Sequence, residues 1–312
     1  MQKIVPHLWF DKEAKEAAAF YVSVFSSQGG SASGGGQNSK VTYQSELHDT
    51  PSGDVDMVAF ELWGHEFQAI SAGPYFKFTQ AISFMVNFDP SKDPDAKMRM
   101  DTIWSKLSDG GQVLMELGTY PWSEHYGFLQ DKYGLSWQLI LTKPEGEERP
   151  AIIPSMLFVN EKCGKAEEAV DFYLSVFKSS KLGVRVKYGP GQEPSQEGTV
   201  MFSDFQLFDE WFTAMDGAGK HAFDFNEAVS LIVRCDSQEE IDYYWEKLSA
   251  VPESEQCGWL KDKYGVSWQI VPTAMDEMMT KGTPEQIARV TKAFLQMKKF
   301  DIAELEKVYR GE

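Results

Sequence analysis

Two residues in strand-like segments of this chain have side chains that could do chemistry. His7 lies in the apolar run at residues 4–10, and Gln138 ends the octapeptide DKYGLSWQ at residues 131–138. An imidazole can carry a proton near neutral pH, and a carboxamide both donates and accepts hydrogen bonds. Alternation along a strand turns His7 and Trp9 to one face, and we expect both to share a first cup with Gln138. The alternative is that His7 is an interior histidine with satisfied hydrogen bonds.

The octapeptide is one copy of an internal repeat. It returns as DKYGVSWQ at residues 262–269, so Gln269 is the counterpart of Gln138. The copies begin 131 residues apart, a domain-sized period rather than that of a solenoid. The chain is therefore predicted to contain two globular halves of one architecture. Trp137 and Trp268, which alternate with the glutamines, are predicted to be core.

Composition excludes several classes of function. Of 312 residues, 42% are hydrophobic, which is enough for a substantial core in each half. The chain has 47 acidic against 30 basic residues, and a net charge of −17 repels phosphate backbones and anionic lipids, so neither nucleic acid nor a membrane is an expected partner. Three scattered cysteines favour reduced thiols. No apolar run is long enough to span a bilayer, no signal peptide is evident, and we expect a cytoplasmic protein.

Each half is predicted to be built twice from a strand, a helix and three strands. Elements of the opening unit of each half are expected at 4–10, 14–25, 40–47, 55–63 and 66–71, and at 153–159, 166–177, 182–188, 198–208 and 211–216. Each half then starts over, with strands at 81–86 and 228–233 and helices at 93–107 and 237–248. The segment at 120–126 is expected to be an aromatic loop near a cup mouth, either gating a substrate or covering an edge.

The repeat also sets the expected domain boundaries. We predict a first domain at 1–143, a linker at 144–150, a second domain at 151–273 and a helical tail at 274–312. The Gly/Ser-rich segment at 28–38, which the second half lacks, is expected to be a surface loop without chemistry. In the tail, Thr283 with Gln286 forms a predicted capping box, and Asp301 caps a last helix. The tail is expected to pack on the body or across a dimer interface.

Several segments together resemble a known family. NEAVSLIV at 226–233, CGWLKDKYGVSWQ at 257–269, PHLWF at 6–10 and QMKKFDI at 296–302 are similar to the PhnB-like group of the vicinal-oxygen-chelate superfamily, which includes relatives of glyoxalase I and of bleomycin-resistance proteins. The resemblance implies an α+β fold of two tandem glyoxalase-like domains with a C-terminal helical tail. Each domain would consist of paired βαβββ modules forming a curled mixed sheet around a ligand cavity.

The resemblance also implies where a metal would lie. Metal-dependent members hold it with residues on the first and fourth strands of the paired modules. These positions fall near His7, Gln68, Ala81 and Gln138 in the first half, and near Ser155, Thr213, Ala228 and Gln269 in the second. Neutral amide, hydroxyl and methyl side chains supply no charge to offset desolvation of a divalent ion. No metal site is therefore predicted.

No other cofactor is predicted. The family is often named for 3-demethylubiquinone methyl transfer, which would require S-adenosylmethionine. Sites for that cofactor commonly use a glycine-rich turn after a parallel strand, and no such turn is found in this sequence. We therefore interpret the family name as inherited rather than descriptive.

The favoured hypothesis is metal-independent binding of a small molecule, aromatic or quinone-like, with catalysis open. The expected ligand-binding residues are His7, Trp9, Gln68, Tyr120, Trp122, Gln138 and Gln269. The first alternative is a lyase, isomerase or methyltransferase in which His7 is the proton carrier. The second is a scaffold role in which one cup has lost its ligand. Either a homodimer or intrachain pairing of the two halves is expected, and the first cup is favoured because four of five histidines precede residue 145.

Overall fold

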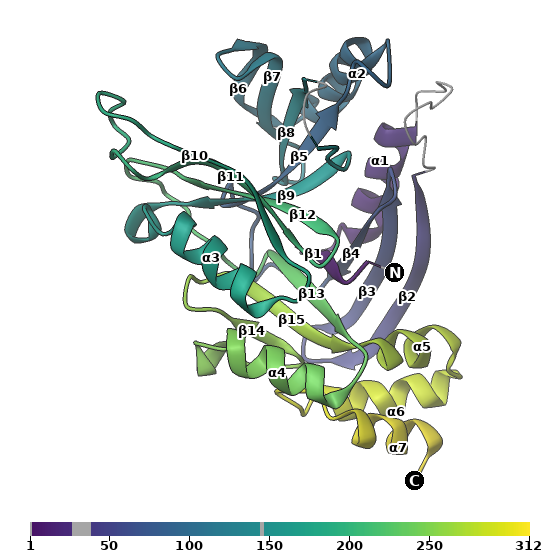
Figure 1. The fold of residues 1–312 in the computed structure, drawn as a ribbon. Helices are drawn as coiled ribbons and strands as arrows, with labels where there is room; N and C mark the ends of the chain where they lie inside the picture. Colours follow the sequence, from purple (N-terminus) through teal and green to yellow (C-terminus); the bar gives the residue numbers. More distant parts are fainter. Residues whose placement is uncertain (1, 27–38, 144–146) are drawn as a thin grey trace.

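The computed structural model describes residues 2–26, 39–143 and 147–312 (Figure 1). The predicted loop at 28–38 and the first residues of the predicted linker lie outside these ranges. Within them, no helix has the length and apolar character needed to cross a membrane. Cys163, Cys235 and Cys257 are free thiols, as their scattered positions predicted.

The chain forms four successive modules that each begin with a strand and a helix. The first two modules contain β1 (Ile4–Phe10), α1 (Ala14–Ser26), β2 (Lys40–Thr50), β3 (Gly53–Leu62) and β4 (His65–Ser71), then β5 (Ile82–Phe88), α2 (Ala96–Ser108), β6 (Gln112–Tyr120), β7 (Ser123–Gln130) and β8 (Ser136–Leu141). The third contains β9 (Ile152–Phe158), α3 (Ala166–Val176), β10 (Lys181–Lys187), β11 (Val200–Leu207) and β12 (Glu210–Asp216). The fourth contains β13 (Val229–Cys235), α4 (Gln238–Leu248), β14 (Trp259–Lys261) and β15 (Ser267–Pro272).

The modules combine into two mixed sheets, which confirms the predicted α+β class. One sheet has the strand order β14-β15-β13-β1-β4-β3-β2, and the other has the order β10-β11-β12-β9-β5-β8-β7-β6. The first strands of modules from opposite halves pair antiparallel, β1 with β13 and β5 with β9. Each sheet therefore takes one module from each half of the chain, and the two halves pair within the chain.

This pairing corrects one expectation from the sequence. His7 lies on β1 of the seven-stranded sheet and Gln138 lies on β8 of the eight-stranded sheet, so the prediction that they share a cup is wrong. The reason is that β1 is flanked by β4 and β13, whereas β8 is flanked by β5 and β7. The predicted boundaries at 143 and 151 divide the chain into its repeats and stay a prediction.

The fourth module departs from the predicted pattern of three strands after the helix. Only β14 and β15 follow α4, because Pro252–Ser254 forms a short 3₁₀-helix where the second module has β6. Proline has no backbone N–H to donate to a ladder, which disfavours a strand there. The backbone amides of Cys257 and Gly258 instead donate to the carbonyls of Met297 and Lys298 in the tail.

The tail is helical, as predicted, with one helix more than expected. The helix α5 (Thr273–Lys281) follows β15 directly, and α6 (Pro284–Phe294) and α7 (Ile302–Arg310) come after it. The capping box between Thr283 and Gln286 is present, and the Asp301 side chain caps α7. Figure 1 shows the three helices gathered beside β2 and β3 at one end of the molecule.

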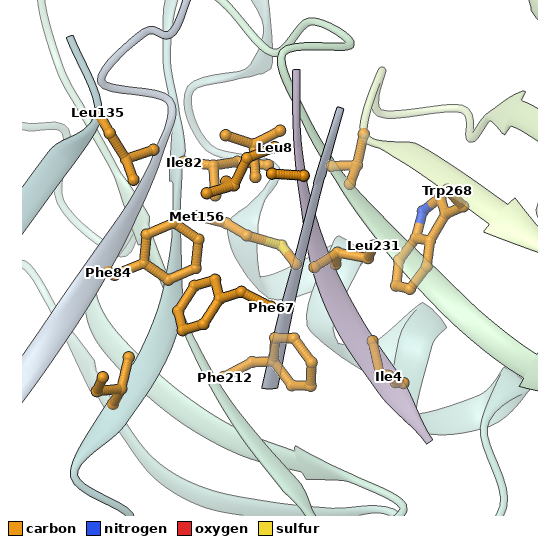
Figure 2. Close-up of a cluster of buried hydrophobic side chains, with 14 of the residues drawn as sticks. Ile4, Leu8, Phe67, Ile82, Phe84, Leu135, Met156, Phe212, Leu231 and Trp268 are labelled. Atoms are coloured by element: carbon orange, nitrogen blue, oxygen red, sulfur yellow. The ribbon is translucent and has the colours of Figure 1, made fainter. Parts of the chain in front are cut away.

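The two sheets share one hydrophobic core. Figure 2 shows Leu8 and Phe67 of the seven-stranded sheet near Phe84 and Met156 of the eight-stranded sheet. The ring centroids of Phe67 and Phe84 are 5.0 Å apart. These contacts lie on the opposite sheet faces from the cups, since Leu8 alternates with His7 along β1. The sheets therefore hold each other in place through their shared core.

The repeated octapeptide surrounds a buried carboxylate. Asp262 Oδ2 accepts hydrogen bonds from the Tyr173 hydroxyl (2.7 Å) and Trp268 Nε1 (2.8 Å), and Oδ1 accepts from the backbone amides of Tyr264 and Val266. The first copy makes the same four bonds around Asp131. Burial raises the pKa of both aspartates, and the donated hydrogen bonds oppose the rise.

We expect Asp262→Asn to destabilise the fold by about 2–4 kcal/mol, because the amide cannot accept all four bonds and leaves buried donors unsatisfied. The measurement is the free energy of unfolding in urea. Asp109→Asn, which changes an exposed aspartate in the same way, should shift it by less than about 0.5 kcal/mol. Equal stability of the Asp262→Asn variant and the unmodified protein would contradict a structural role for this carboxylate.

Candidate functional site

A cavity of about 640 Å³ lies on the His7 face of the seven-stranded sheet, which we call cup A. Strands β1 to β4 and β13 to β15 form its wall, and the C-terminal tail forms its cover. The residues of the tail that line it are Met275, Asp276, Met279, Thr280, Phe294, Leu295 and Phe300. The Tyr43 hydroxyl donates to the Met279 carbonyl and fixes α5 over the sheet (2.8 Å). Cup A is thus covered in part by the segment that follows its last strand.

Aromatic rings form one end of this cavity. The rings of Trp9 and Trp259 meet edge to face with centroids 6.1 Å apart, and Phe76 contacts Trp9 in the same way at 5.1 Å. The Trp9 indole N–H donates to the Gly73 carbonyl, which fixes its orientation. Such rings offer a rigid apolar surface to a planar ligand.

A short row of polar side chains crosses the cavity wall. His7 pairs in register with Gln68 on β4, and both line the cavity with Gln269. Gln269 Nε2 donates to the Ser230 hydroxyl at 2.9 Å. His7 is 6% exposed, its ring lies 5.5 Å from that of Trp259, and its Nδ1 has no hydrogen-bond partner among the described residues. Burial lowers the pKa of His7 to about 3, so the imidazole is neutral at pH 7.

The face of the eight-stranded sheet that carries Gln138, which we call cup B, is different. Gln138 donates to the Ser83 and Ser155 hydroxyls (2.8 and 3.3 Å) and accepts from the Tyr126 hydroxyl (2.8 Å). Three groups of the protein therefore use its hydrogen bonds. Gln138 is therefore an interior residue whose hydrogen bonds are satisfied by the protein, whereas Gln269 in cup A makes one side-chain hydrogen bond, to Ser230.

The end of the linker occupies part of cup B. The Arg149 guanidinium lies 3.6 Å from the centroid of the Trp211 ring, and its Nε donates to Asp204 Oδ2 at 2.8 Å. A cavity of about 240 Å³ remains beside it, and Trp122 lines this cavity. Cup B is thus smaller than cup A and is partly filled by the chain itself.

The aromatic segment at 120–126 belongs to cup B and is not a loop. Tyr120 ends β6 and Ser123 begins β7, so only Pro121 and Trp122 form the turn of a hairpin. The ring of Tyr120 stacks on that of Trp122, with centroids 5.2 Å apart. The expectation of a loop was wrong because the strands continue to both sides of a two-residue turn.

The structure also changes which residues stand at the family's metal positions. Ser230 faces His7 across β1 and β13, and Ser83 faces Ser155 across β5 and β9, where the sequence placed Ala228 and Ala81. The resulting sets are His7, Gln68, Ser230 and Gln269 in cup A, and Ser83, Gln138, Ser155 and Thr213 in cup B. The only group of three metal-type donors among the described residues, on the exposed β2–β3 hairpin, lines neither cavity. These donor sets do not fit the family's metal centre.

Four of the seven predicted ligand-binding residues come together in cup A, namely His7, Trp9, Gln68 and Gln269. Gln138, Tyr120 and Trp122 belong to cup B. The sequence reasoning missed Trp259 and Arg234, which line cup A from the fourth module. Trp259 lies directly opposite Gln269 across β14 and β15. Pairing of these two strands could therefore have indicated Trp259, since residues directly opposite each other share a sheet face.

Comparison with known proteins confirms the resemblance. A family model described as 3-demethylubiquinone-9 3-methyltransferase matches residues 2–140 and 150–271. The PhnB protein from Bacillus cereus is 34% identical over 45% of this chain and 100% of its own, with a TM-score of 0.37. Glyoxalase I from Zea mays shares the fold at 13% identity, over 88% of this chain and 96% of its own, with a TM-score of 0.52. No curated protein matches the chain.

The fold is shared with glyoxalase I, and because the family's model matches both halves, the chain belongs to the 3-demethylubiquinone-9 3-methyltransferase family.

Proposed function

We propose that this protein binds a small aromatic or quinone-like molecule in cup A without a metal. The observation that carries the proposal is the cavity of about 640 Å³, in which the unpartnered Nδ1 of His7 is buried beside Trp259. Ligand sites are typically cavities of about 300–1,000 Å³, mostly apolar with a few oriented polar groups. An unsatisfied buried polar atom costs about 1–3 kcal/mol, which a ligand that supplies its partner would recover.

The polar row can hold a carbonyl or hydroxyl group. Gln269 Nε2 already donates to Ser230, whereas no hydrogen bond ties the Gln68 side chain within the described chain. The amide of Gln68 can therefore donate to a ligand oxygen, and His7 can accept from a hydroxyl. A quinol or phenol edge offers both kinds of group within one flat ring system. The apolar rings of Trp9 and Phe76 would contact its faces.

A role for His7 in positioning fits better than a role in proton transfer. Its pKa of about 3 keeps the ring neutral at pH 7 and makes it a weak base. Catalysis by His7 would require the bound substrate to raise that pKa toward neutrality. The enzyme alternative therefore depends on a change on binding, whereas hydrogen bonding uses the imidazole as it stands.

Cup B is not proposed as the main site. Arg149 stacked on Trp211 occupies part of it, and Gln138 has no free hydrogen-bonding group for a ligand. This agrees with the scaffold alternative for one of the cups. The same arrangement makes cup B a built-in control, because its glutamine stands at the position equivalent to Gln269.

The first prediction from this proposal concerns ligand binding. Screening small aromatic and quinol compounds by thermal shift should identify ones that raise Tm, and Gln269→Leu should weaken their binding about 3- to 30-fold, since it removes an oriented polar group from the cavity. Gln138→Leu, the matched change in cup B, should leave the dissociation constant unchanged. Weakening by Gln138→Leu alone would place the site in cup B.

Metal independence and methyl transfer are tested on the same compounds. Excess chelator should leave their dissociation constants unchanged, and elemental analysis should find no stoichiometric zinc, nickel, iron or manganese. S-adenosylmethionine should give neither a thermal shift nor a methylated product with phenolic ligands. A stoichiometric ion that is needed for binding, or methyl transfer from S-adenosylmethionine, would overturn the proposal.

The second prediction concerns the protonation of His7. In the unfolded chain its pKa is near 6.5, against about 3 in the fold, so below pH 6.5 the unfolded state binds more protons. The stability that depends on neutral His7 is complete well above pH 6.5 and is lost as the pH falls below that value. Between pH 6.5 and about pH 5 the loss should be about 2 kcal/mol.

His7→Gln isolates this contribution, because half-buried His65, whose pKa is lowered to about 4, destabilises the fold in acid in the same direction. The free energy of unfolding of His7→Gln should therefore fall less steeply between pH 6.5 and 5 than that of the unmodified protein. Parallel curves would show that His7 titrates normally in the folded protein and would reopen its role as a proton carrier.

A further inference from the structure

The wall of cup A carries more negative than positive groups. Glu66, Glu227, Glu253 and Asp276 line the cavity, whereas Arg234 is the only lysine or arginine among the described residues that do. His7 adds no charge at pH 7, because burial keeps it neutral. The cavity therefore presents a negative field to whatever enters it.

Four of the five N–H groups of Arg234 are already bonded, to two carboxylates and a backbone carbonyl. Its Nη1 donates to Glu66 Oε2 (2.7 Å) and to the Gln2 carbonyl, and its Nη2 donates to Glu66 Oε1, which makes a bidentate pair. Its Nε donates to Asp276 Oδ2 at 3.0 Å. One guanidinium thus faces two carboxylates, and this end of the cavity keeps a net charge of −1.

Of the two carboxylates that pair with Arg234, Asp276 is the one with an oxygen available to a ligand. Both oxygens of Glu66 are bonded to Arg234, but Asp276 meets it through Oδ2 alone, and no partner of Oδ1 is found in the described chain. The Asp276 side chain is 35% exposed, and it lies on α5 beside Met275 and Met279, which also line the cavity. Burial and the nearby Glu66 carboxylate raise the pKa of Asp276, while Arg234 opposes the rise. A cation at Oδ1 would relieve that repulsion.

The opposite end of the cavity is compatible with the same kind of ligand. Glu227 is paired with Lys261 at 2.7 Å and is neutralised, while exposed Glu253 stands without an ion pair among the described residues. The rings of Trp9 and Trp259 also lie at this end, because the Trp9 backbone amide donates to the Ala228 carbonyl, next to Glu227. Aromatic faces attract cations and also contact apolar groups, so they do not oppose a positively charged aromatic molecule.

We propose that cup A selects organic cations with an aromatic body over anions of the same shape, and that Asp276 is the partner of the positive group. This rests on the proposed function, because it names the charge class of the ligand that cup A binds. An amine paired with Asp276 would place its ring against the apolar side chains that line the cavity beside it, such as Met275 and Met279. An aromatic carboxylate would meet the net charge of −1 at the Arg234 end, where four of the five N–H groups of Arg234 already have partners.

Three naphthalene compounds of matched shape test the inference at pH 7, namely 1-naphthylmethylamine as the cation, 1-naphthylmethanol as the neutral form and 1-naphthoate as the anion. Dissociation constants are measured by calorimetry. The amine should bind about tenfold more tightly than the alcohol, corresponding to one charge-assisted hydrogen bond, and the acid should bind most weakly. In Asp276→Asn the advantage of the amine over the alcohol should fall to about twofold.

Two control variants separate the possible failures. Glu277→Gln removes the same charge from the neighbouring position of α5, where the side chain is 72% exposed and does not line the cavity, and it should keep the tenfold preference. Gln269→Leu should weaken the alcohol if binding occurs in cup A.

Equal binding of all three compounds, or tightest binding of the acid, would overturn the charge inference and leave the proposed function standing. Loss of the amine's preference in Glu277→Gln as well as in Asp276→Asn would overturn the assignment to Asp276. Failure of every naphthalene compound, together with failure of the wider aromatic and quinol screen, would overturn the proposed function itself.

Discussion

The pairing of β1 with β13 is the constraint on which cup A depends. It joins the first module to the fourth across more than 200 residues of chain, with Ile4 opposite Val233 and Leu8 opposite Val229. A first strand whose faces are both buried must satisfy its backbone groups on two sides, and β4 supplies only one of them. The strand from the opposite half supplies the other. The same requirement pairs β5 with β9, so one chain forms two cups that each combine both halves.

The repeated octapeptide then fixes the wall of each cup. Around Asp131 and Asp262, two backbone amides close a turn and a tyrosine and a tryptophan anchor the strand that follows. This accounts for the near identity of the two copies, since a buried carboxylate needs donors at defined positions and few residue types supply them. The tryptophans point into the core, so alternation turns Gln138 and Gln269 into the cups. The motif is structural, and its effect on the cups is to position one glutamine in each.

Much of the fold could be predicted from the sequence, and the site only in part. Periodicity and capping residues predicted most elements, including the capping box at Thr283, because these signals are local. The partner of each first strand is a long-range property. No local pattern shows that β15, rather than β8, belongs to the sheet of β1 and carries the glutamine that lines cup A. That is why His7 was grouped with Gln138 rather than with Gln269. The alternation that turns His7 and Trp9 to one face could be predicted, since it depends only on neighbouring residues.

The difference between the cups arises from segments outside the repeats. The tail follows β15, and its backbone bonds to Cys257 and Gly258 where the fourth module lacks a strand, so it covers cup A while leaving a cavity beneath it. The linker precedes β9 and places Arg149 within cup B instead. A cover that leaves His7 Nδ1 without a partner maintains an unsatisfied polar atom, which is unfavourable in a closed interior. Thr213 Oγ1 in cup B also lacks a partner, so the asymmetry lies in the cavities, about 640 Å³ in cup A against about 240 Å³ in cup B, and this difference is why we propose binding in cup A.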